Sequence, residues 1–265
     1  MKYHRLTKQK VSGSARFLVN LDDFIKQMKL LETLNYTTVT FQDVHLYQEG
    51  RLSLPKKPII ITFDGGHRTT YELAIPVMMQ LKMQGVIFVL GDRSMRYAVW
   101  KEEKRRERLP LMTDWQILEA RKNGFEIGAH SMNHPDLSDF GLRKIREEIV
   151  RSRQTLEYLL GEPVHSFAYP HGLLDTRIES IVAEAGFRFA CGDYGGSSGI
   201  RENPFNIHRA SVYNNSRTLR FYIRLTAPYK FFEWGYYSLK KKSSMNSISV
   251  GHDYVPTISY EKNFR

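Results

Sequence analysis

One acidic residue stands directly after a strand of the buried type. Residues 59–61 are three consecutive isoleucines, and the apolar segment runs on to Asp64, where Gly65 and Gly66 interrupt it. Such an unbroken β-branched run is typical of a strand buried on both faces of a parallel sheet. In α/β proteins, acids at the carboxyl ends of these strands often take part in catalysis, although the same position can simply cap the next helix. Asp64 is therefore the first candidate for chemistry.

Two histidines lie four residues apart, His130 and His134, and the first of them ends another apolar strand, residues 125–129. The carboxyl ends of parallel strands converge on one face of a barrel, so we expect these imidazoles to lie near Asp64. Two imidazoles and a carboxylate form the ligand set of many catalytic zinc sites, in which one position stays open. The alternative is that both histidines only form hydrogen bonds within a loop.

Two later segments offer further site residues. Residues 167–172 (Phe-Ala-Tyr-Pro-His-Gly) end a third strand in a tight turn, where the backbone amide of His171 is a candidate oxyanion donor. His208 and Arg209 lie at another strand end, where they could supply an acid or a charge clamp. Asp193, in a glycine-rich loop, is a weaker candidate for an extra metal ligand. An ordinary turn and a structural histidine are the alternatives for His171 and His208.

The elements that position these residues alternate between strand and helix six or seven times. Alternation of this kind predicts a parallel sheet with right-handed crossovers, and a closed barrel is the simplest arrangement over roughly 200 residues. We therefore predict an α/β fold, a distorted parallel barrel of about seven strands, in residues 1–240. A basic, polar tail, residues 241–265, follows it. Asn20 and the pair Thr113 and Gln116 are the expected helix-capping residues.

Composition limits the compartment and the partners. The 265 residues include one cysteine, so an internal disulfide is excluded. The sequence contains neither an apolar run of about 20 residues nor a signal-peptide core, which predicts a cytoplasmic or membrane-peripheral protein. The net charge of +11 favours anionic partners. No nucleic-acid-binding motif is present, so nucleic acid is not an expected partner. Residues 217–242 mix aromatic and basic side chains, which suits an anionic membrane surface or simply a closing helix.

Taken in order, these segments resemble the polysaccharide deacetylase family, the metal-dependent carbohydrate esterases that remove N-acetyl groups. The early Tyr-His pair and the Phe-Ala-Tyr-Pro turn are similar to the branch acting on poly-N-acetylglucosamine. The resemblance implies a distorted parallel barrel, an N-acetylated glycan or lipid-linked sugar as substrate, and a divalent metal, zinc above all. It rests on residues 3–4 (Tyr-His), 50–55, 61–64 (Ile-Thr-Phe-Asp), 128–134 (Gly-Ala-His-Ser-Met-Asn-His), 167–170 and 203–205 (Asn-Pro-Phe).

By position, the resemblance implies that Asp64 is the general base and that His130 and His134 are metal ligands. The amide of His171 would help to hold the oxyanion. The family's late Leu-x-His acid motif is not evident, and His208 is its nearest substitute. We also expect Asp64 to contribute to the metal site, because the usual third ligand is missing.

The sequence departs from the family pattern beside Asp64. The family motif is Thr-Phe-Asp-Asp-Gly, in which the second aspartate is a metal ligand, and Gly65 replaces it here. Metal affinity should therefore be low, and Gly65→Asp is expected to raise it. The arginine that orients the base in many relatives is Ala168 in this chain.

Three hypotheses follow from this departure. The first is a working N-deacetylase in which Asp64, Asp136 or Asp193 completes the metal site. The second is a catalytically impaired barrel that binds glycans or helps to assemble them. The third is an enzyme that acts on lipid-linked sugars at a membrane surface.

Overall fold

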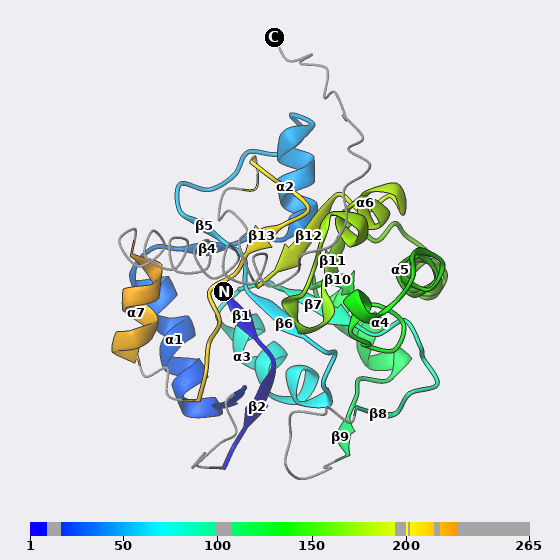
Figure 1. Ribbon diagram of the computed structural model, residues 1–265. Coiled ribbons are helices and arrows are strands. Elements are labelled where there is room, and N and C mark those ends of the chain that lie inside the picture. The colour runs from blue at the N-terminus through cyan, green and yellow to red at the C-terminus, as the bar shows by residue number, and fades with distance from the viewer. Residues whose placement is uncertain (10–16, 99–107, 194–199, 201, 215–217, 227–265) are drawn as a thin grey trace, which may run out of the picture.

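The protein is described by a computed structural model in which residues 1–9, 17–98, 108–193, 200, 202–214 and 218–226 are placed. Their central feature is a curled sheet of seven parallel strands (Figure 1). The strands follow the order β1-β6-β7-β10-β11-β12-β13 across the sheet. Their bounds are β1 Lys2–Tyr3, β6 Thr62–Asp64, β7 Val86–Val89, β10 Glu126–Ala129, β11 Ser166–Ala168, β12 Phe189–Gly192 and β13 Ile207–His208.

The first strand joins the two edges of this sheet. The amide of Lys2 donates a hydrogen bond to the carbonyl of Ala210 (2.8 Å), and the amide of Val212 donates to the carbonyl of Lys2 (2.8 Å). These bonds connect β1 with the chain just beyond β13, while β1 also pairs with β6. The sheet therefore closes on itself, and the predicted parallel α/β barrel of about seven strands is confirmed.

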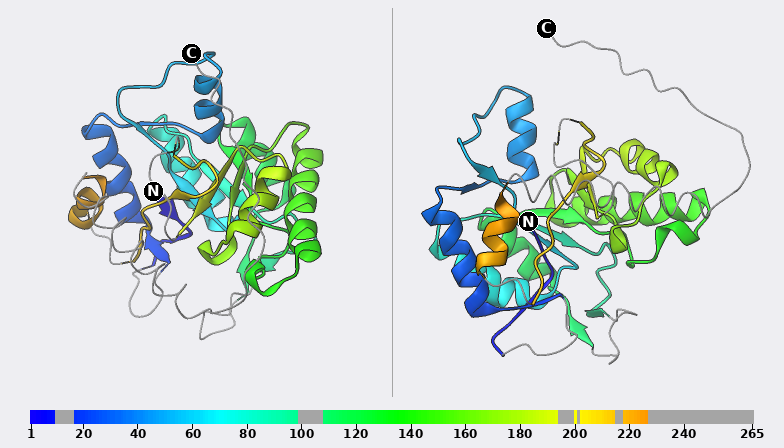
Figure 2. Two further views of the ribbon diagram at one scale, coloured as in Figure 1. Left: turned by 45° about the horizontal axis from the view of Figure 1, so that its top comes forward. Right: turned by 60° about the vertical axis from the view of Figure 1, so that its left-hand side comes forward.

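The helices pack outside the sheet (Figures 1 and 2). Within the chain, α1 packs against α7 and α5 against α6. None of the described helices combines the length and the apolarity that crossing a bilayer requires. Their bounds are α1 Leu21–Thr33, α2 Phe41–Gln48, α3 Ile75–Gln80, α4 Asp114–Lys122, α5 Leu142–Leu160, α6 Thr176–Glu184 and α7 Thr218–Leu225.

The expected helix caps are confirmed. Asn20 accepts a hydrogen bond from the amide of Asp22 at the start of α1, and Thr113 and Gln116 form a capping box at the start of α4. The segment after Asp64 is not one continuous α-helix, because a π-helical turn, η1 (Thr70–Ala74), precedes α3. Pro76 has no amide hydrogen and cannot form the bond that an α-helix requires there.

Short elements complete the described chain. Three two-stranded sheets pair β2 (Arg5–Thr7) with β3 (Leu18–Asn20), β4 (Thr37–Thr38) with β5 (Pro58–Ile59), and β8 (Tyr97–Ala98) with β9 (Leu109–Pro110). Two 3₁₀ turns are η2 (Leu137–Asp139) and η3 (Pro170–Gly172). The predicted tail, residues 241–265, and most of the basic aromatic segment lie outside the described residues.

The core has two layers because successive side chains of a strand point to opposite faces. Phe63 points outward and packs against Tyr3 (ring centroids 5.6 Å apart) and Phe24 (6.0 Å), which fastens α1 to the sheet. Phe88 points inward, where the inner cluster also contains Phe41 and Phe189. Inward-pointing residues of several strands therefore share one enclosed space.

Candidate active site

Alternation along the strands places polar residues inside the barrel. In β6, Thr62 and Asp64 flank the outward-pointing Phe63, so both face the interior. Side-chain alternation also directs Lys2 of β1 to the inner face. The same holds for Arg209, which lies just after β13. All four residues are at least nine-tenths buried. Parallel pairing brings these residues together although they are far apart in the sequence.

Arg209 clamps Asp64. Its Nη1 donates to Oδ1 of Asp64 (2.6 Å) and its Nη2 donates to Oδ2 (2.7 Å), while Nη1 also donates to Oγ1 of Thr62 (2.9 Å). Burial alone would raise the pKa of Asp64, but the adjacent guanidinium outweighs it and holds that pKa well below its usual range. Asp64 is therefore ionised. The sequence suggested either an acid or a charge clamp at this strand end. Arg209 forms the charge clamp.

A second, partly buried ion pair lies beside the first. Nζ of Lys2 donates to Oδ2 of Asp193, and the other oxygen of Asp193 lies 4.0 Å from Nη2 of Arg209. Burial raises the pKa of Asp193, but Lys2 and Arg209 outweigh this effect and lower it. Two carboxylates and two cationic groups therefore form one network with balanced charge, in which only Asp193 is partly exposed.

His130 is held in a defined tautomer. Its Nδ1 lies 2.7 Å from the carbonyl oxygen of Ala168 on β11. A carbonyl can only accept, so Nδ1 carries the proton and Nε2 keeps its lone pair. Burial is the main cause that lowers the pKa of His130, so the ring is neutral. A neutral imidazole with a free lone pair on Nε2 is suited to bind a metal.

The loop from His130 to His134 is tightly constrained. Ser131 and His134 have left-handed backbone angles (φ 60° and 58°), and Oγ of Ser131 accepts from the amide of His134 (3.0 Å). The buried carboxylate of Glu148, on α5, accepts from the amides of Met132 and Asn133 (both 3.1 Å). As a result, the rings of His130 and His134 meet edge to face with centroids 4.7 Å apart.

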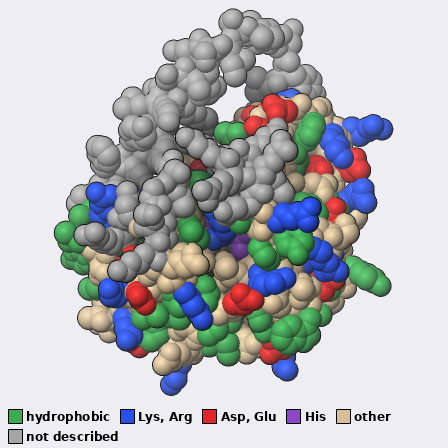
Figure 3. Space-filling model, turned by 90° about the horizontal axis from the view of Figure 1, so that it is seen from below, with side chains coloured by type: hydrophobic (Ala, Val, Ile, Leu, Met, Phe, Trp, Pro, Cys, Tyr) green, Lys and Arg blue, Asp and Glu red, His purple; other side chains and the backbone are tan. Residues whose placement is uncertain are grey.

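Two further histidines border this pair. The ring of His171 lies 4.6 Å from that of His134, and its backbone is left-handed (φ 57°) within η3. His4, directly after β1, is enclosed, and burial lowers its pKa to about 3. No motif in the sequence assigned a site role to His4, although it lies two residues after Lys2 and therefore faces the same side of the sheet. From the carboxyl end of the strands, a small histidine surface is visible among Lys and Arg side chains (Figure 3).

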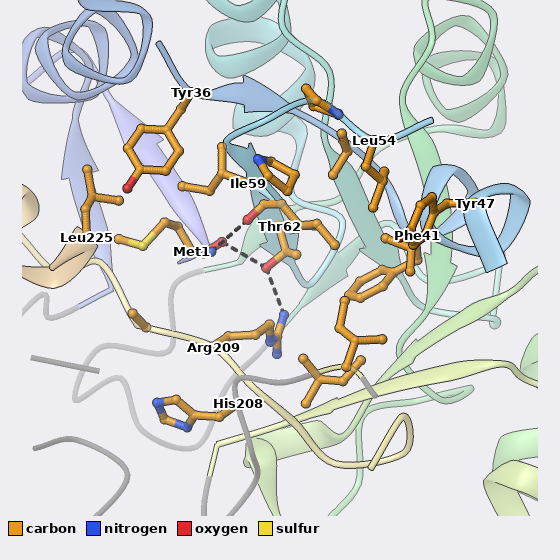
Figure 4. Close-up of a pocket in the computed structure, with 18 of the residues that line it drawn as sticks. Met1, Tyr36, Phe41, Tyr47, Leu54, Ile59, Thr62, His208, Arg209 and Leu225 are labelled. Atoms are coloured by element: carbon orange, nitrogen blue, oxygen red, sulfur yellow. Dashed lines mark hydrogen bonds between the residues drawn. The ribbon is translucent and has the colours of Figure 1, made fainter. Parts of the chain in front are cut away.

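His208 lies apart from these residues. Because side chains alternate, it points to the other face from Arg209. It lines a cavity of about 590 Å³ at the amino-terminal end of the strands (Figure 4). The lining of this cavity is mostly apolar and includes none of Asp64, His130 and His134, but Thr62 and Arg209 reach it. The cavity therefore adjoins the site at these two residues without containing Asp64 or the two histidines.

The described residues offer part of a metal site. Two adjacent imidazoles fit such a site, but no group of three or more His, Cys, Asp or Glu side chains in the described ranges is arranged to hold a metal ion. The three acids considered as third ligand are already engaged. Asp64 pairs with Arg209, Asp193 pairs with Lys2, and Asp136 accepts from the amide and hydroxyl of Ser138 (3.0 and 2.6 Å).

Comparison with known proteins identifies the family. A family model described as polysaccharide deacetylase matches residues 51–190. The poly-beta-1,6-N-acetyl-D-glucosamine N-deacetylase of Staphylococcus aureus (strain MRSA252) is 22% identical over 209 residues, which cover 71% of this chain and 69% of that protein. The chain therefore belongs to the polysaccharide deacetylase family, a family of carbohydrate deacetylases, as its motifs indicated.

Solved structures agree with this fold. The deacetylase PplD of Streptococcus pyogenes, in complex with acetate, has a TM-score of 0.71 at 19% identity and covers 85% of this chain and 96% of its own. IcaB from Ammonifex degensii has a TM-score of 0.68 at 24% identity, with coverage of 85% and 95%. The family match includes Asp64, His130, His134 and His171, but Arg209 lies beyond its end. A search for family motifs alone therefore misses the partner of Asp64.

Proposed function

We propose that this protein removes N-acetyl groups from an amino sugar, with Asp64 as the general base. The proposal is supported above all by an ionised carboxylate that is fixed by Arg209 in the same enclosed space as two adjacent imidazoles. Family membership supplies the class of reaction. The acetate bound to PplD, the product of such a hydrolysis, supports the same reaction type.

His130 and His134 are the side chains proposed to hold the metal. A divalent cation there, zinc above all, would polarise the acetamide carbonyl and make water a nucleophile at neutral pH. Asp64 accepts the proton of the attacking water. Arg209 holds both carboxylate oxygens and so fixes the orientation of Asp64 before that transfer. We assign Asp64 to proton transfer rather than to metal binding, because both of its oxygens already accept from Arg209.

The backbone amide of His171 is the proposed donor to the developing oxyanion. The turn η3 places this residue next to His134, and a backbone donor requires no particular side chain. We give His208 no role in the reaction, because it lines the cavity at the amino-terminal end of the strands, which contains none of Asp64, His130 and His134.

The proposed substrate is an N-acetylated glycan or a lipid-linked sugar. The Staphylococcus aureus relative is named for poly-beta-1,6-N-acetyl-D-glucosamine, which makes oligomers of this sugar the first substrates to test. The positive net charge suits a sugar that carries phosphate or lies at an anionic surface. Membrane association and the cytoplasmic or peripheral location stay predictions from the sequence.

The test measures acetate release from β-1,6-linked N-acetylglucosamine oligomers, with zinc or cobalt added and after treatment with a chelator. We expect release that depends on the metal and that falls about 10²-fold or more in Asp64→Asn, which removes the base while keeping its shape. An exposed control, Asp22→Asn, should leave the rate unchanged.

The competing function is a barrel that binds glycans without cleaving them. It is favoured by Gly65 in the place of a ligand and by the lack of a three-ligand group among the described residues. Saturable binding of the oligomers without acetate release, with every metal tried, would establish this alternative and end the proposal of catalysis.

A further inference from the structure

A groove in the outer helical layer runs between α4 and the segment formed by η1 and α3. It has a volume of about 470 Å³ and is lined by Tyr71, Glu72, Ile75, Pro76, Met79, Glu119 and Asn123. Residues four apart lie on one side of a helix, so Trp115 continues the row of Glu119 and Asn123 on α4. From Tyr71 to Met79 this α3–α4 groove is about 12 Å long.

Two aromatic rings stand at one end of the α3–α4 groove. Trp115 is 64% exposed, and its ring meets that of Tyr71 edge to face with centroids 5.7 Å apart. Large aromatic side chains stabilise a fold mainly when they are buried, so Trp115 contributes little to the core. Its ring face is available instead to a molecule outside the fold.

The lining of the groove is acidic, although the chain as a whole has a net charge of +11. The charged residues of this lining are Glu72 and Glu119, and neither forms an ion pair within the described part of the chain. Nδ2 of Asn123 donates to Oε1 of Glu119 (3.2 Å), which helps to orient that carboxylate. The faces of aromatic rings also attract cations. Carboxylates and aromatic rings together therefore favour a cationic ligand.

The aromatic end of the groove is fastened to the loop that follows β6. The amide of Met112 donates to the carbonyl of Gly66 (2.8 Å), and His67 forms an antiparallel bridge with Leu111. Helix α4 begins two residues after Met112, and η1 begins three residues after His67. The groove therefore starts at the loop that carries the proposed base at its beginning and leads away from it.

We propose that the α3–α4 groove binds a stretch of glycan from which acetyl groups have already been removed. The inference rests on the proposed function, because hydrolysis of an acetamide releases acetate and leaves an amine, which is protonated near neutral pH. The ammonium groups pair with Glu72 and Glu119, and the C–H face of a sugar ring stacks on Trp115. The processed part of a linear glycan thus stays on the protein while the next acetamide reaches Asp64.

The experiment measures the binding of two β-1,6-linked pentamers to the full-length protein by calorimetry at pH 6. One is a pentamer of glucosamine, and the other is a pentamer of glucose, which has neither a charge nor an acetamide to hydrolyse. We expect the glucosamine pentamer to bind at least about 10-fold more tightly, as two exposed charge pairs allow. The net positive charge of the chain opposes this order, so the preference reports on the local acids of the groove.

Variants locate the binding in the groove. Trp115→Ala should weaken binding of the glucosamine pentamer about 2- to 5-fold, as expected for an exposed cation–π contact. The double variant Glu72→Gln/Glu119→Gln should weaken it about 10-fold. Tyr158→Ala, at a 93% exposed position on α5, and Glu32→Gln, at an exposed position on α1, are the matched controls and should bind like the wild type. Circular dichroism checks that each variant is folded.

Three results would overturn this proposal. The glucose pentamer could bind as tightly as the glucosamine pentamer, or Trp115→Ala and the double variant could both bind like the wild type. A lysine pentamer could also bind as tightly and lose affinity in the same variants, which would show that the groove accepts any cationic chain, a basic peptide included. Failure of the proposed function has a different signature: the groove binds the glucosamine pentamer, but the protein releases no acetate from acetylated oligomers.

Discussion

Arg209 sets the charge state of the proposed base. Asp64 is enclosed, and an unpaired carboxylate there would bind a proton rather than stay ionised. The two hydrogen bonds from the guanidinium of Arg209 reverse this tendency. At Ala168, where the family resemblance implied an arginine, the backbone carbonyl accepts from Nδ1 of His130. In the proposed mechanism, Arg209 orients Asp64 from the chain just after β13.

Replacement of Arg209 should therefore change the pH dependence of activity. The folded protein lowers the pKa of Asp64, so ionised Asp64 stabilises the fold at any pH above the pKa of an ordinary aspartate. This contribution is lost as the pH falls through the lowered pKa of the folded protein. In Arg209→Met the pKa of Asp64 rises, and the acid limb of the rate profile should move to higher pH. Removing one partner of a buried pair should also cost about 3–5 kcal/mol of unfolding free energy. An unmoved acid limb in a folded variant would contradict the assigned role.

Glu126 gives a second pH-dependent prediction, separate from the reaction. Burial raises its pKa to about 7, although Oγ of Ser166 and the amide of Gln42 donate to it. Between the ordinary value of 4.5 and about 7, the folded protein binds a proton that the unfolded chain has lost. Stability should therefore fall as the pH rises through this window, by on the order of a few kcal/mol.

Glu126→Gln should remove this dependence, because the amide resembles the protonated acid in shape. Urea unfolding at pH 5 and pH 8 measures the effect. The difference between the two pH values should be smaller in the variant than in the wild type, and the variant should be the more stable at pH 8. Equal pH dependence in both proteins would show that Glu126 does not titrate in this range.

At the scale of elements, helix α5 positions the loop that carries the proposed ligands. Glu148 is on the buried face of this helix and binds two backbone amides of the loop, while Glu147 is on the exposed face and pairs with Lys144 and Arg151. A long amphipathic helix thus serves both the core and the site. The sequence predicts the apolar stripe of α5. The burial of Glu148 is explained only by the loop amides that donate to it.

Glu148→Gln should weaken metal binding by about 10-fold and lower the rate of acetate release with it, since partners of ligands contribute 10- to 100-fold. Glu147→Gln, one residue away, is the matched control and should change neither. Calorimetry with cobalt and circular dichroism separate an effect on the site from a loss of the helix. If both variants behaved alike, the loop would not depend on Glu148.

For the whole molecule, closure of the barrel depends on pairing between distant segments. Strand β1 lies between β6 and the chain after β13, so the beginning and the end of the described sheet meet there. The ion pair of Lys2 and Asp193 adds a partly buried side-chain connection from β1 to the loop after β12. Both pairings join residues separated by most of the chain.

A double-mutant cycle can measure this connection. Asp193→Asn should destabilise the protein by about 3–5 kcal/mol, because it leaves the buried ammonium of Lys2 without its partner. Lys2→Met should cost less, because Asp193 is partly exposed and still lies near Arg209. The double variant should lose clearly less than the sum of the two. Chemical unfolding of the four proteins supplies the comparison, and additive losses would mean that the pair does not contribute to closure.

The sequence by itself determined the barrel, the helix caps and the candidates Asp64, His130 and His134. These depend on local patterns, namely apolar runs, capping residues and the ends of strands, and each pattern is complete within a few neighbouring residues. The turn η1 before α3 departs from a regular α-helix where Pro76 interrupts the hydrogen bonding.

Only the tertiary structure decided which groups surround those candidates. Arg209 reaches Asp64 across 145 residues, and His67 lies in the space that Gly65 leaves open. Both contacts depend on the register and curl of the sheet, which set the direction of every inward side chain. A local pattern predicts that a strand ends in an acid, but not which side chain meets that acid across the barrel.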